Sequence, residues 1–248
     1  MTEDTVPAGA GRAAGGEREK RRTALRFARD AAIIVVVALL VSFLVKTFVV
    51  RSFYIPSGSM ENTLQIQDKI IVNELQPSLL PLARGDVVVF RDPGGWLPRA
   101  APTRQDPLGQ VVDTALTFVG LSASDSDDHL VKRVIGLPGD HVTCCTAGGR
   151  LTVNGVPIVE PYVVVPSGQV DAATVAFDVT VPAGELWVMG DNRYASQDSS
   201  RNQALSGHGF VPVSNVVGRA FVISWPSSRW TWLDDYPEVF ARVEESSG

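Results

Sequence analysis

The feature that most constrains this chain is one long apolar segment close to its N-terminus. The segment runs from Ala31 to Val50 and contains a single charged residue, Lys46. Its 20 residues would extend about 30 Å as a helix, which matches the hydrocarbon core of a bilayer. We therefore predict one transmembrane helix over 31–50, with the Lys46 amine able to reach the interface. The remaining hydrophobic residues form short runs, so a protein with several spans is excluded.

The charges on the two sides of this segment indicate its orientation. Residues from Arg18 to Arg29 include six basic side chains and one acid, whereas 22 acids and 13 bases follow from Ser52 onward. Positive charge favours the cytoplasmic side, so we predict a disordered basic cytoplasmic tail over 1–30 and an extracytoplasmic domain over 51–248. A cleaved signal peptide is the alternative, but the apolar run is longer than a usual signal-peptide core and no convincing small-residue cleavage site follows it.

Charge and cysteine content limit the partners. The formal net charge is −5 and no basic domain is present, which argues against nucleic acid as a partner. The two cysteines, Cys144 and Cys145, are adjacent and no His-Glu-x-x-His motif occurs, so we expect neither a metal nor a cofactor. The cysteine pair could form a strained vicinal disulfide or remain as two thiols, and the sequence leaves both states open.

The chain beyond the apolar segment has the pattern of a β-rich domain. Asn154-Gly155 separates the short runs 150–153 and 156–159, and this dipeptide predicts a two-residue hairpin. Strands and helices do not alternate, so we predict a mainly β fold: an antiparallel β-sheet domain with a smaller β subdomain at 141–186 and a mobile insertion at 92–128. The six clearest strand-length runs are Lys69–Val72, Asp86–Phe90, Leu130–Ile135, Arg150–Val153, Leu186–Met189 and Arg219–Ile223.

One short segment has residues suited to nucleophilic chemistry. Ser59 lies eight residues after Arg51, within Ser57-Gly58-Ser59-Met60, so a reactive hydroxyl there would act close to the membrane surface. A serine nucleophile requires a base to accept its proton. None of the three histidines has the setting of a nucleophile elbow; they are His129, His141 and His208.

A lysine can replace histidine as the base if apolar surroundings keep its amine neutral. The chain has four lysines, of which Lys20 and Lys46 fall in the predicted tail and span. Lys69 follows Asp68, which would keep it charged. Lys132 lies between apolar residues in a predicted buried strand, so it is the better candidate. The alternative is that Lys132 and the next arginine form a salt-bridged basic pair on a solvated sheet face.

Five short motifs follow one another along the predicted extracytoplasmic domain. They are Ser57–Leu64, Asp68–Val72, Arg84–Phe90, Val131–Asp140, and Gly190–Arg193 with Ser196 and Asp198. In this order, after one N-terminal span, they resemble the ordered boxes of the bacterial type I signal peptidases. The resemblance extends from Ser57 to about Arg219, while 92–128 and the last thirty residues match nothing recognisable.

The resemblance implies a membrane-bound serine endopeptidase that removes signal peptides from secreted preproteins through a Ser-Lys dyad. By this likeness Ser59 is the nucleophile and Lys132 is the general base. The oxyanion would be held by the backbone N–H of Ser59 and the hydroxyl of Ser57. Ser196 would form a hydrogen bond to the lysine and orient it.

The chain departs from the family pattern at two places. Asp198 and Arg201 resemble a supporting ion pair, but the family has Asp-Ser-Arg and this chain has one residue more between the two charges. Asn62 stands where the family usually has proline, which should loosen the turn after the nucleophile.

The resemblance also implies shallow apolar pockets that accept small side chains, the Ala-x-Ala pattern of signal peptides. By similarity these pockets are lined by Ile55, Pro56, Met60, Leu64, Leu130 and Val131. Phe53 and Tyr54 are candidates to enter the lipid interface. Core packing is expected for the tryptophans Trp187, Trp225, Trp230 and Trp232.

The expected partners are therefore preprotein signal peptides and membrane lipid, and the expected location is the plasma membrane. Two other classes remain. One is a membrane-tethered extracytoplasmic β-rich binding or scaffold protein, in which the boxes are only turns. The other is a different Ser-Lys enzyme such as a relative of the self-cleaving repressors, although the apolar anchor and the lack of a DNA-binding helical domain argue against it.

Overall fold

The computed structural model describes residues 26–27, 29–41, 50–97, 128–163 and 165–247. The chain forms two compact units, which are Met1–Thr47 and Phe48–Gly248.

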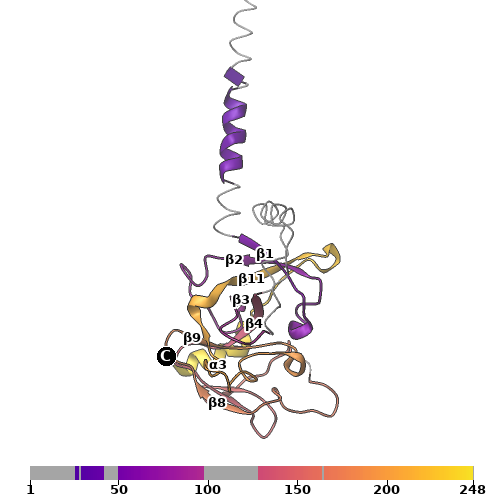
Figure 1. The fold of residues 1–248 in the computed structure, drawn as a ribbon, viewed down its shortest axis with the longest axis vertical. Coiled ribbons are helices and arrows are strands. Elements are labelled where there is room, and N and C mark those ends of the chain that lie inside the picture. Colours follow the sequence, from indigo (N-terminus) through magenta and orange to yellow (C-terminus); the bar gives the residue numbers. More distant parts are fainter. Residues whose placement is uncertain (1–25, 28, 42–49, 98–127, 164, 248) are drawn as a thin grey trace, which may run out of the picture. The chain divides into compact units, whose positions relative to one another are not determined.

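The first unit contains 31–41 of the predicted span, and these residues belong to a stretch that is helical over 29–41 (Figure 1). No helix within the described ranges has the length and apolar character needed to cross a bilayer. Most of the predicted tail lies outside the described residues, as does 42–49 of the predicted span. The predicted span ends at Val50, whereas the structure places Val50 at the start of a strand.

The second unit is built around a main antiparallel sheet (Figure 1). Its strands lie in the order β1-β2-β11-β3-β4-β9-β10, and β12 pairs with β11. Four of the strands predicted from the sequence, β2, β3, β4 and β9, occur here, and β11 extends a fifth. The bounds are β1 Val50–Tyr54, β2 Lys69–Asn73, β3 Val87–Arg91, β4 His129–Gly136, β9 Glu185–Met189, β10 Val211–Pro212, β11 Val216–Trp225 and β12 Thr231–Trp232.

A second, four-stranded sheet has the order β7-β6-β5-β8 and lies within the predicted smaller β region. The hairpin predicted at Asn154-Gly155 is confirmed, because it joins β6 to β7 with Val153 opposite Val156. Both turn residues have positive φ, +52° and +77°, as a two-residue turn of this kind requires. The four strands are β5 His141–Cys144, β6 Thr152–Val153, β7 Val156–Pro157 and β8 Phe177–Thr180.

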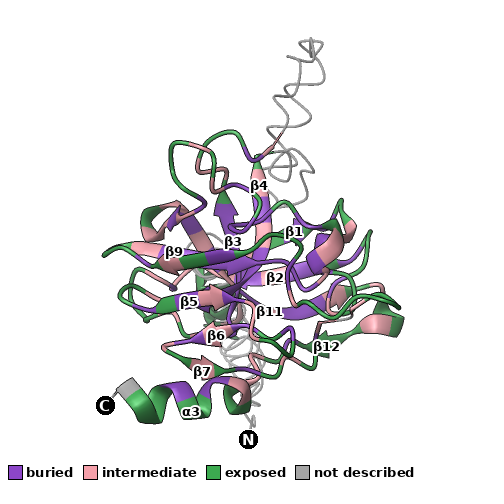
Figure 2. Cartoon of the chain, turned by 90° about the horizontal axis from the view of Figure 1, so that it is seen from below, coloured by how far each residue is buried: buried purple, intermediate pink, exposed green. Residues whose placement is uncertain are grey.

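A C-terminal helix, α3 (Pro237–Ser247), was not predicted from the sequence. Its buried residues Phe240 and Val243 are three apart, so they share one face of the helix. They join a core cluster with Trp187 of β9 and with residues of the second sheet. Figure 2 shows that buried residues follow the strands while much of α3 is exposed.

The aromatic residues are distributed differently from the sequence prediction. Trp187 is fully buried as expected, but three other tryptophans are more than half exposed, and their core packing is corrected here: Trp225, Trp230 and Trp232. Trp225 ends β11, Trp232 ends the short strand β12 and Trp230 directly precedes that strand. The rings of Trp230 and Trp232 contact each other instead of a core. Phe53 is 3% exposed and packs in the core, whereas its neighbour Tyr54 is exposed because successive side chains of a strand face opposite sides.

The predicted insertion at 92–128 is described only at its ends, since 98–127 lie outside the described residues. At the first end, Asp92 Oδ1 accepts hydrogen bonds from the backbone N–H groups of Gly94 and Trp96. The Trp96 ring then packs edge-on against Phe90 of β3.

Candidate active site

The serine predicted as nucleophile lies in a short 3-10 turn, η1 (Gly58–Met60), which directly follows β1. Met60 is 1% exposed and anchors the turn in the core of the main sheet. From the other side, the backbone N–H of Asn192 donates to the Ser59 carbonyl oxygen at 3.1 Å. The Asn192 side-chain amide donates to the Gly58 carbonyl oxygen, also at 3.1 Å. The turn is therefore held on both sides.

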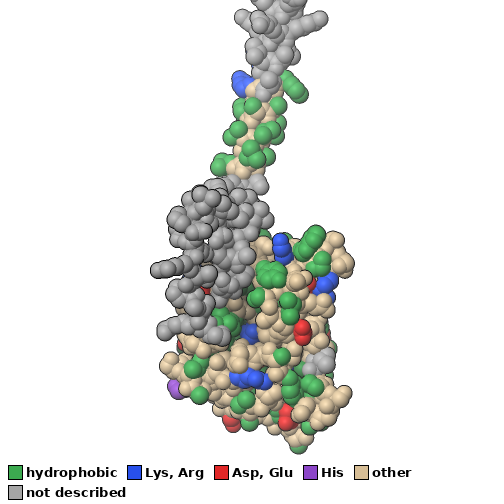
Figure 3. All heavy atoms as spheres, turned by 45° about the vertical axis from the view of Figure 1, so that its right-hand side comes forward, with side chains coloured by type: hydrophobic (Ala, Val, Ile, Leu, Met, Phe, Trp, Pro, Cys, Tyr) green, Lys and Arg blue, Asp and Glu red, His purple; other side chains and the backbone are tan. Residues whose placement is uncertain are grey.

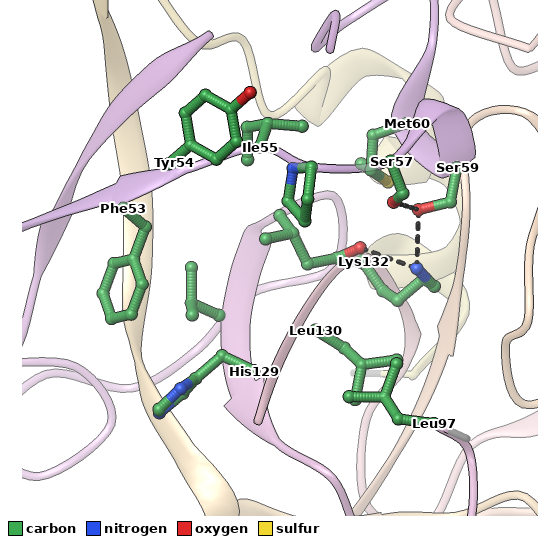
Figure 4. A pocket seen from close by; sticks show the side chains of 13 residues that line it. Phe53, Tyr54, Ile55, Ser57, Ser59, Met60, Leu97, His129, Leu130 and Lys132 are labelled. Atoms are coloured by element: carbon green, nitrogen blue, oxygen red, sulfur yellow. Dashed lines mark hydrogen bonds between the residues drawn. The ribbon is translucent and has the colours of Figure 1, made fainter. Parts of the chain in front are cut away.

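Strand β4 brings Lys132 to this turn (Figure 4). The Lys132 amine is 2.8 Å from the Ser59 hydroxyl oxygen and donates to the Val131 carbonyl oxygen at 2.9 Å. Lys132 is 3% exposed, and Ser59 is 9% exposed. Within the part of the chain that the structure describes, the amine forms no ion pair with a carboxylate. The two residues that the sequence pointed to are thus in direct contact.

Burial has a large effect on the acidity of this amine. The apolar surroundings of Lys132 disfavour the ammonium form, while the negative charges of Asp198 and Asp191 partly offset that effect. The net result lowers the pKa of Lys132 from 10.5 to about 8. A substantial fraction of Lys132 is therefore neutral at mildly alkaline pH, when it can accept a proton.

The next residue of β4, Arg133, is buried on the opposite face and is not exposed at all. Its guanidinium donates to both carboxylate oxygens of Asp191, at 2.9 and 2.7 Å. The group also lies 4.1 Å from the ring centre of Tyr162 and 5.2 Å from that of Tyr236. Burial alone would lower the pKa of Arg133, but Asp191 together with Tyr162 and Tyr236 outweighs burial, and the pKa is raised. The sequence motifs contained both partners, yet only the fold showed that they pair.

An apolar pocket opens beside the serine and the lysine (Figure 4). Ser57 lies at its edge, with its hydroxyl 3.4 Å from that of Ser59. Leu64 is the exception among the predicted lining residues: it is fully buried in the core of the main sheet and does not reach the pocket. The predicted residues that do line the pocket are Ile55, Pro56, Met60, Leu130 and Val131.

Other lining residues were not predicted from the sequence. His129 lies beside Phe53, with 5.4 Å between the ring centres, and Figure 4 shows both rings away from the Ser59 hydroxyl. Their side chains enter the pocket because β1 and β4 contribute to the same wall, which no local sequence signal reveals. The other unpredicted lining residues are Tyr54, Val89 and Leu97.

Ser196 and Gly190 lie close together near the nucleophile. Ser196 is 1% exposed, but its hydroxyl has no hydrogen-bond partner among the described residues, so the expected bond to Lys132 is not formed. An added Cβ on Gly190 would collide with the Ser196 side chain and would approach the Ser59 carbonyl oxygen to 2.5 Å. This close approach explains why a glycine is needed at position 190.

The predicted ion pair between Asp198 and Arg201 is also absent. Asp198 is buried and accepts hydrogen bonds from the backbone N–H of Gly190 and from both the backbone N–H and the hydroxyl of Ser200. Arg201 is exposed and donates to the Tyr194 carbonyl oxygen at 3.0 Å. The extra residue noted in the sequence therefore brings Ser200, not Arg201, against the carboxylate.

The turn after the nucleophile differs from the expectation as well. Asn62 has a φ of +91°, a conformation that proline cannot adopt. Its side-chain amide donates to the Tyr162 carbonyl oxygen at 3.2 Å. The turn is thus tied to the smaller β region and is not loosened. Away from the site, Cys144 and Cys145 are joined in a disulfide, one of the two states that the sequence left open.

A β-rich domain in which a serine hydroxyl contacts a buried, partly neutral amine has the chemistry of a serine hydrolase. A family model described as "Signal peptidase, peptidase S26" matches residues 28–225. The chain therefore belongs to the signal peptidase family, peptidase S26. The resemblance seen in the sequence motifs is confirmed, and membership of a peptidase family favours an enzyme over the binding or scaffold alternative.

Two mycobacterial relatives agree with this family. Signal peptidase I of Mycobacterium tuberculosis is 39% identical over 237 residues, which cover 86% of this chain and 76% of the relative. Probable signal peptidase I of Mycobacterium leprae is 38% identical over 242 residues, covering 88% and 82% of the two chains. A solved signal peptidase I from Enterococcus faecalis V583 is 25% identical, with a TM-score of 0.36, and covers 56% of this chain and 95% of its own.

Proposed function

We propose that this protein removes N-terminal signal peptides from secreted preproteins, with Ser59 as the nucleophile and Lys132 as the general base. The observation that carries this proposal is the 2.8 Å contact between the Ser59 hydroxyl and an amine that is buried without a carboxylate partner in the described part of the chain. Membership of the signal peptidase family supports the same reaction.

In the first half-reaction, the neutral Lys132 amine accepts the Ser59 proton while the serine oxygen attacks the scissile carbonyl carbon. The resulting oxyanion accepts hydrogen bonds from the Ser57 hydroxyl and the Ser59 backbone N–H, and loss of one such donor is expected to slow the reaction about 100-fold. Lys132 then returns the proton to the leaving amine as the C–N bond breaks. Water next attacks the ester carbonyl carbon and gives a proton to Lys132. As the acyl C–O bond to Ser59 breaks, Lys132 returns that proton to the serine oxygen, which restores the Ser59 hydroxyl and releases the signal peptide with a free carboxyl end.

This mechanism predicts a pH dependence with a defined direction. Because burial lowers the pKa of Lys132 to about 8, the neutral base becomes more abundant as the pH rises through that value. Activity should therefore rise with pH through about 8 and fall about tenfold for each unit on the acid side.

The pocket beside the dyad fits small apolar side chains before the cut. Five predicted residues line it, and its walls come mainly from the end of β1 and the start of β4. Such a pocket favours alanine at the first and third positions before the cut, because larger side chains meet buried core residues. The substrate pattern is therefore the Ala-x-Ala sequence of secretory signal peptides.

We further propose that the protein is anchored in the plasma membrane by 31–50, with the N-terminus cytoplasmic and the peptidase domain extracytoplasmic. The apolar segment and the basic residues before it support this placement. The exposed indoles on β11 and β12 also suit a lipid interface, where tryptophan is enriched.

The proposal is tested by incubating the full-length protein in detergent micelles with a purified preprotein and locating the cut by mass spectrometry. We expect one cut after Ala-x-Ala. Ser59→Ala and Lys132→Met should each abolish it, whereas His129→Ala should not, because the His129 ring lies beside Phe53. Equal inactivity of His129→Ala, or an activity that is flat from about pH 5 to about pH 9, would contradict the lysine mechanism.

A further inference from the structure

A short segment of the smaller β region, Glu160–Tyr162, contacts the active-site region at three places. Its first contact reaches the nucleophile turn. The Asn62 amide, three residues after Ser59, donates to the Tyr162 carbonyl oxygen at 3.2 Å. Because Tyr162 is 3% exposed, this contact joins the end of the turn to a fixed point.

The second contact of the segment is an ion pair with the chain that holds the Ser59 carbonyl. Glu160 accepts a hydrogen bond from the Arg193 guanidinium at 2.5 Å, and both side chains are almost completely buried. Arg193 also donates from Nε to the Gly190 carbonyl oxygen at 3.0 Å. Asn192 lies between Gly190 and Arg193 in the sequence, and its backbone N–H donates to the Ser59 carbonyl oxygen. The Glu160 carboxylate thus holds segment 190–193 in place, and this segment forms the hydrogen bond to the Ser59 carbonyl oxygen.

The third contact reaches the strand of the proposed base. The Tyr162 ring lies 4.1 Å from the Arg133 guanidinium, and Arg133 is the neighbour of Lys132 on β4. The Tyr162 hydroxyl donates to Glu160 at 2.7 Å, which connects this contact to the ion pair. A cation over an aromatic ring is attracted to its face, and more strongly where water is excluded.

We propose that Glu160–Tyr162 is a positioning segment. It belongs to the smaller β region and fixes the position of the Ser59 turn relative to the strand that carries Lys132. Its three contacts are with Asn62 in the turn after the nucleophile, with Arg193 in the segment that bonds the Ser59 carbonyl, and with Arg133 next to the base. The hydrophobic core of the second sheet is made by other residues and does not require these polar contacts. This inference rests on the proposed function of the dyad.

The main test compares Tyr162→Leu with Tyr162→Phe in the full-length protein, using a preprotein cleavage assay that separates kcat from KM. Leucine removes the ring face under Arg133, and we expect kcat to fall by about tenfold or more, because small displacements of reacting groups are costly. KM should change by less than about twofold, because Tyr162 is not among the residues that line the substrate pocket. Both variants keep the main-chain carbonyl that accepts from Asn62, but only phenylalanine keeps the ring, so its loss of kcat should be clearly smaller.

A matched control separates positioning from general stability. Leu151 is fully buried in the core of the smaller β region and is not among the residues that line the pocket beside the dyad. Leu151→Ala should lower Tm at least as much as Tyr162→Leu, yet leave kcat unchanged at temperatures well below Tm. If Leu151→Ala reduces kcat as strongly as Tyr162→Leu, the segment contributes only stability and the inference is overturned.

A second variant tests the contact to the nucleophile turn without removing a buried side chain. Asn62→Asp keeps the size and tolerates the positive φ but removes the hydrogen-bond donor, so kcat should fall by about threefold with KM unchanged. Wild-type kcat in both Asn62→Asp and Tyr162→Leu would refute the inference. Ser59→Ala in the same assay distinguishes the two proposals, because residual cleavage by that variant would refute the dyad itself.

Discussion

The two faces of β4 bury neighbouring basic residues in opposite ways. On one face, Lys132 has a serine hydroxyl and a carbonyl oxygen as its neighbours, and burial lowers its pKa to about 8. On the other face, Arg133 is paired with Asp191 and its pKa is raised. Burial without a countercharge prepares an amine to act as a base, whereas burial with one makes a permanent structural charge.

The largest effect on the rate of cleavage is expected when Lys132 is replaced by an arginine, the residue type that is buried on the other face of β4. Lys132→Arg keeps the positive charge but removes the neutral form, because a guanidinium stays protonated in proteins. Preprotein cleavage should fall by about 1000-fold or more. Lys69→Arg is the matched control, since Lys69 is exposed on β2 and should leave the rate unchanged. Retention of a tenth of the wild-type rate by Lys132→Arg would show that Lys132 is not the base.

On the arginine face, removal of one partner should destabilise the fold. Arg133→Met leaves the Asp191 carboxylate buried without its countercharge, and we expect the free energy of unfolding to fall by about 3–5 kcal/mol. Urea denaturation at neutral pH measures this change. Arg150→Met, at an exposed arginine, should stay within about 0.5 kcal/mol of the wild type. A similar result for the two variants would mean that the buried pair is not structural.

For Lys132→Met, in contrast to Arg133→Met, we expect the free energy of unfolding to increase. The folded-state pKa of Lys132 is about 8 and lies below the unfolded value, so the unfolded chain binds more protons between about pH 8 and about pH 10.5. Wild-type stability should rise with pH across that window, and below it the buried ammonium costs about 3 kcal/mol. Lys132→Met should therefore be more stable than the wild type by up to about 3 kcal/mol at pH 7, with the gain shrinking above pH 8. A less stable variant at pH 7 would contradict this account.

The smallest effect concerns a charge that tunes the lysine without touching it. The negative charge of Asp198 raises the pKa of Lys132, against the larger effect of burial. Asp198→Asn should therefore move the midpoint of the pH–rate profile to lower pH. Asp178→Asn is the control, because Asp178 is exposed on β8 of the second sheet. A shift of the Asp198→Asn midpoint to higher pH would show that another group controls the profile.

The sequence predicted the features that follow from local patterns. Short β-branched runs marked the central strands, and the Asn154-Gly155 dipeptide marked a hairpin, because both signals reside within a few residues. The contact between Ser59 and Lys132 joins residues 73 positions apart. It could be predicted only through the resemblance of the motifs to a known family.

The features that the sequence missed depend on distant parts of the chain. Core packing is expected for Trp225 from the sequence, but its position as the last residue of β11 leaves it exposed. Leu64 was assigned to the pocket by similarity, whereas its side chain fills the core behind it. Arg201 does not pair with Asp198, because with one added residue in the turn it is Ser200 that donates to the Asp198 carboxylate. The sequence alone does not show how a single insertion changes the geometry of a turn.

The carbonyl of Val131 has a consequence for how the dyad begins its work. An uncharged amine carries two hydrogens and one lone pair. The Val131 carbonyl oxygen, 2.9 Å away, accepts a hydrogen bond from one of those two N–H groups. Once the ammonium loses its extra proton, the lone pair becomes free to face the Ser59 oxygen, and the hydroxyl becomes the donor at an unchanged separation of the two heavy atoms. Deprotonation alone thus reverses the polarity of the contact, and no side chain has to change rotamer before the first bond is made.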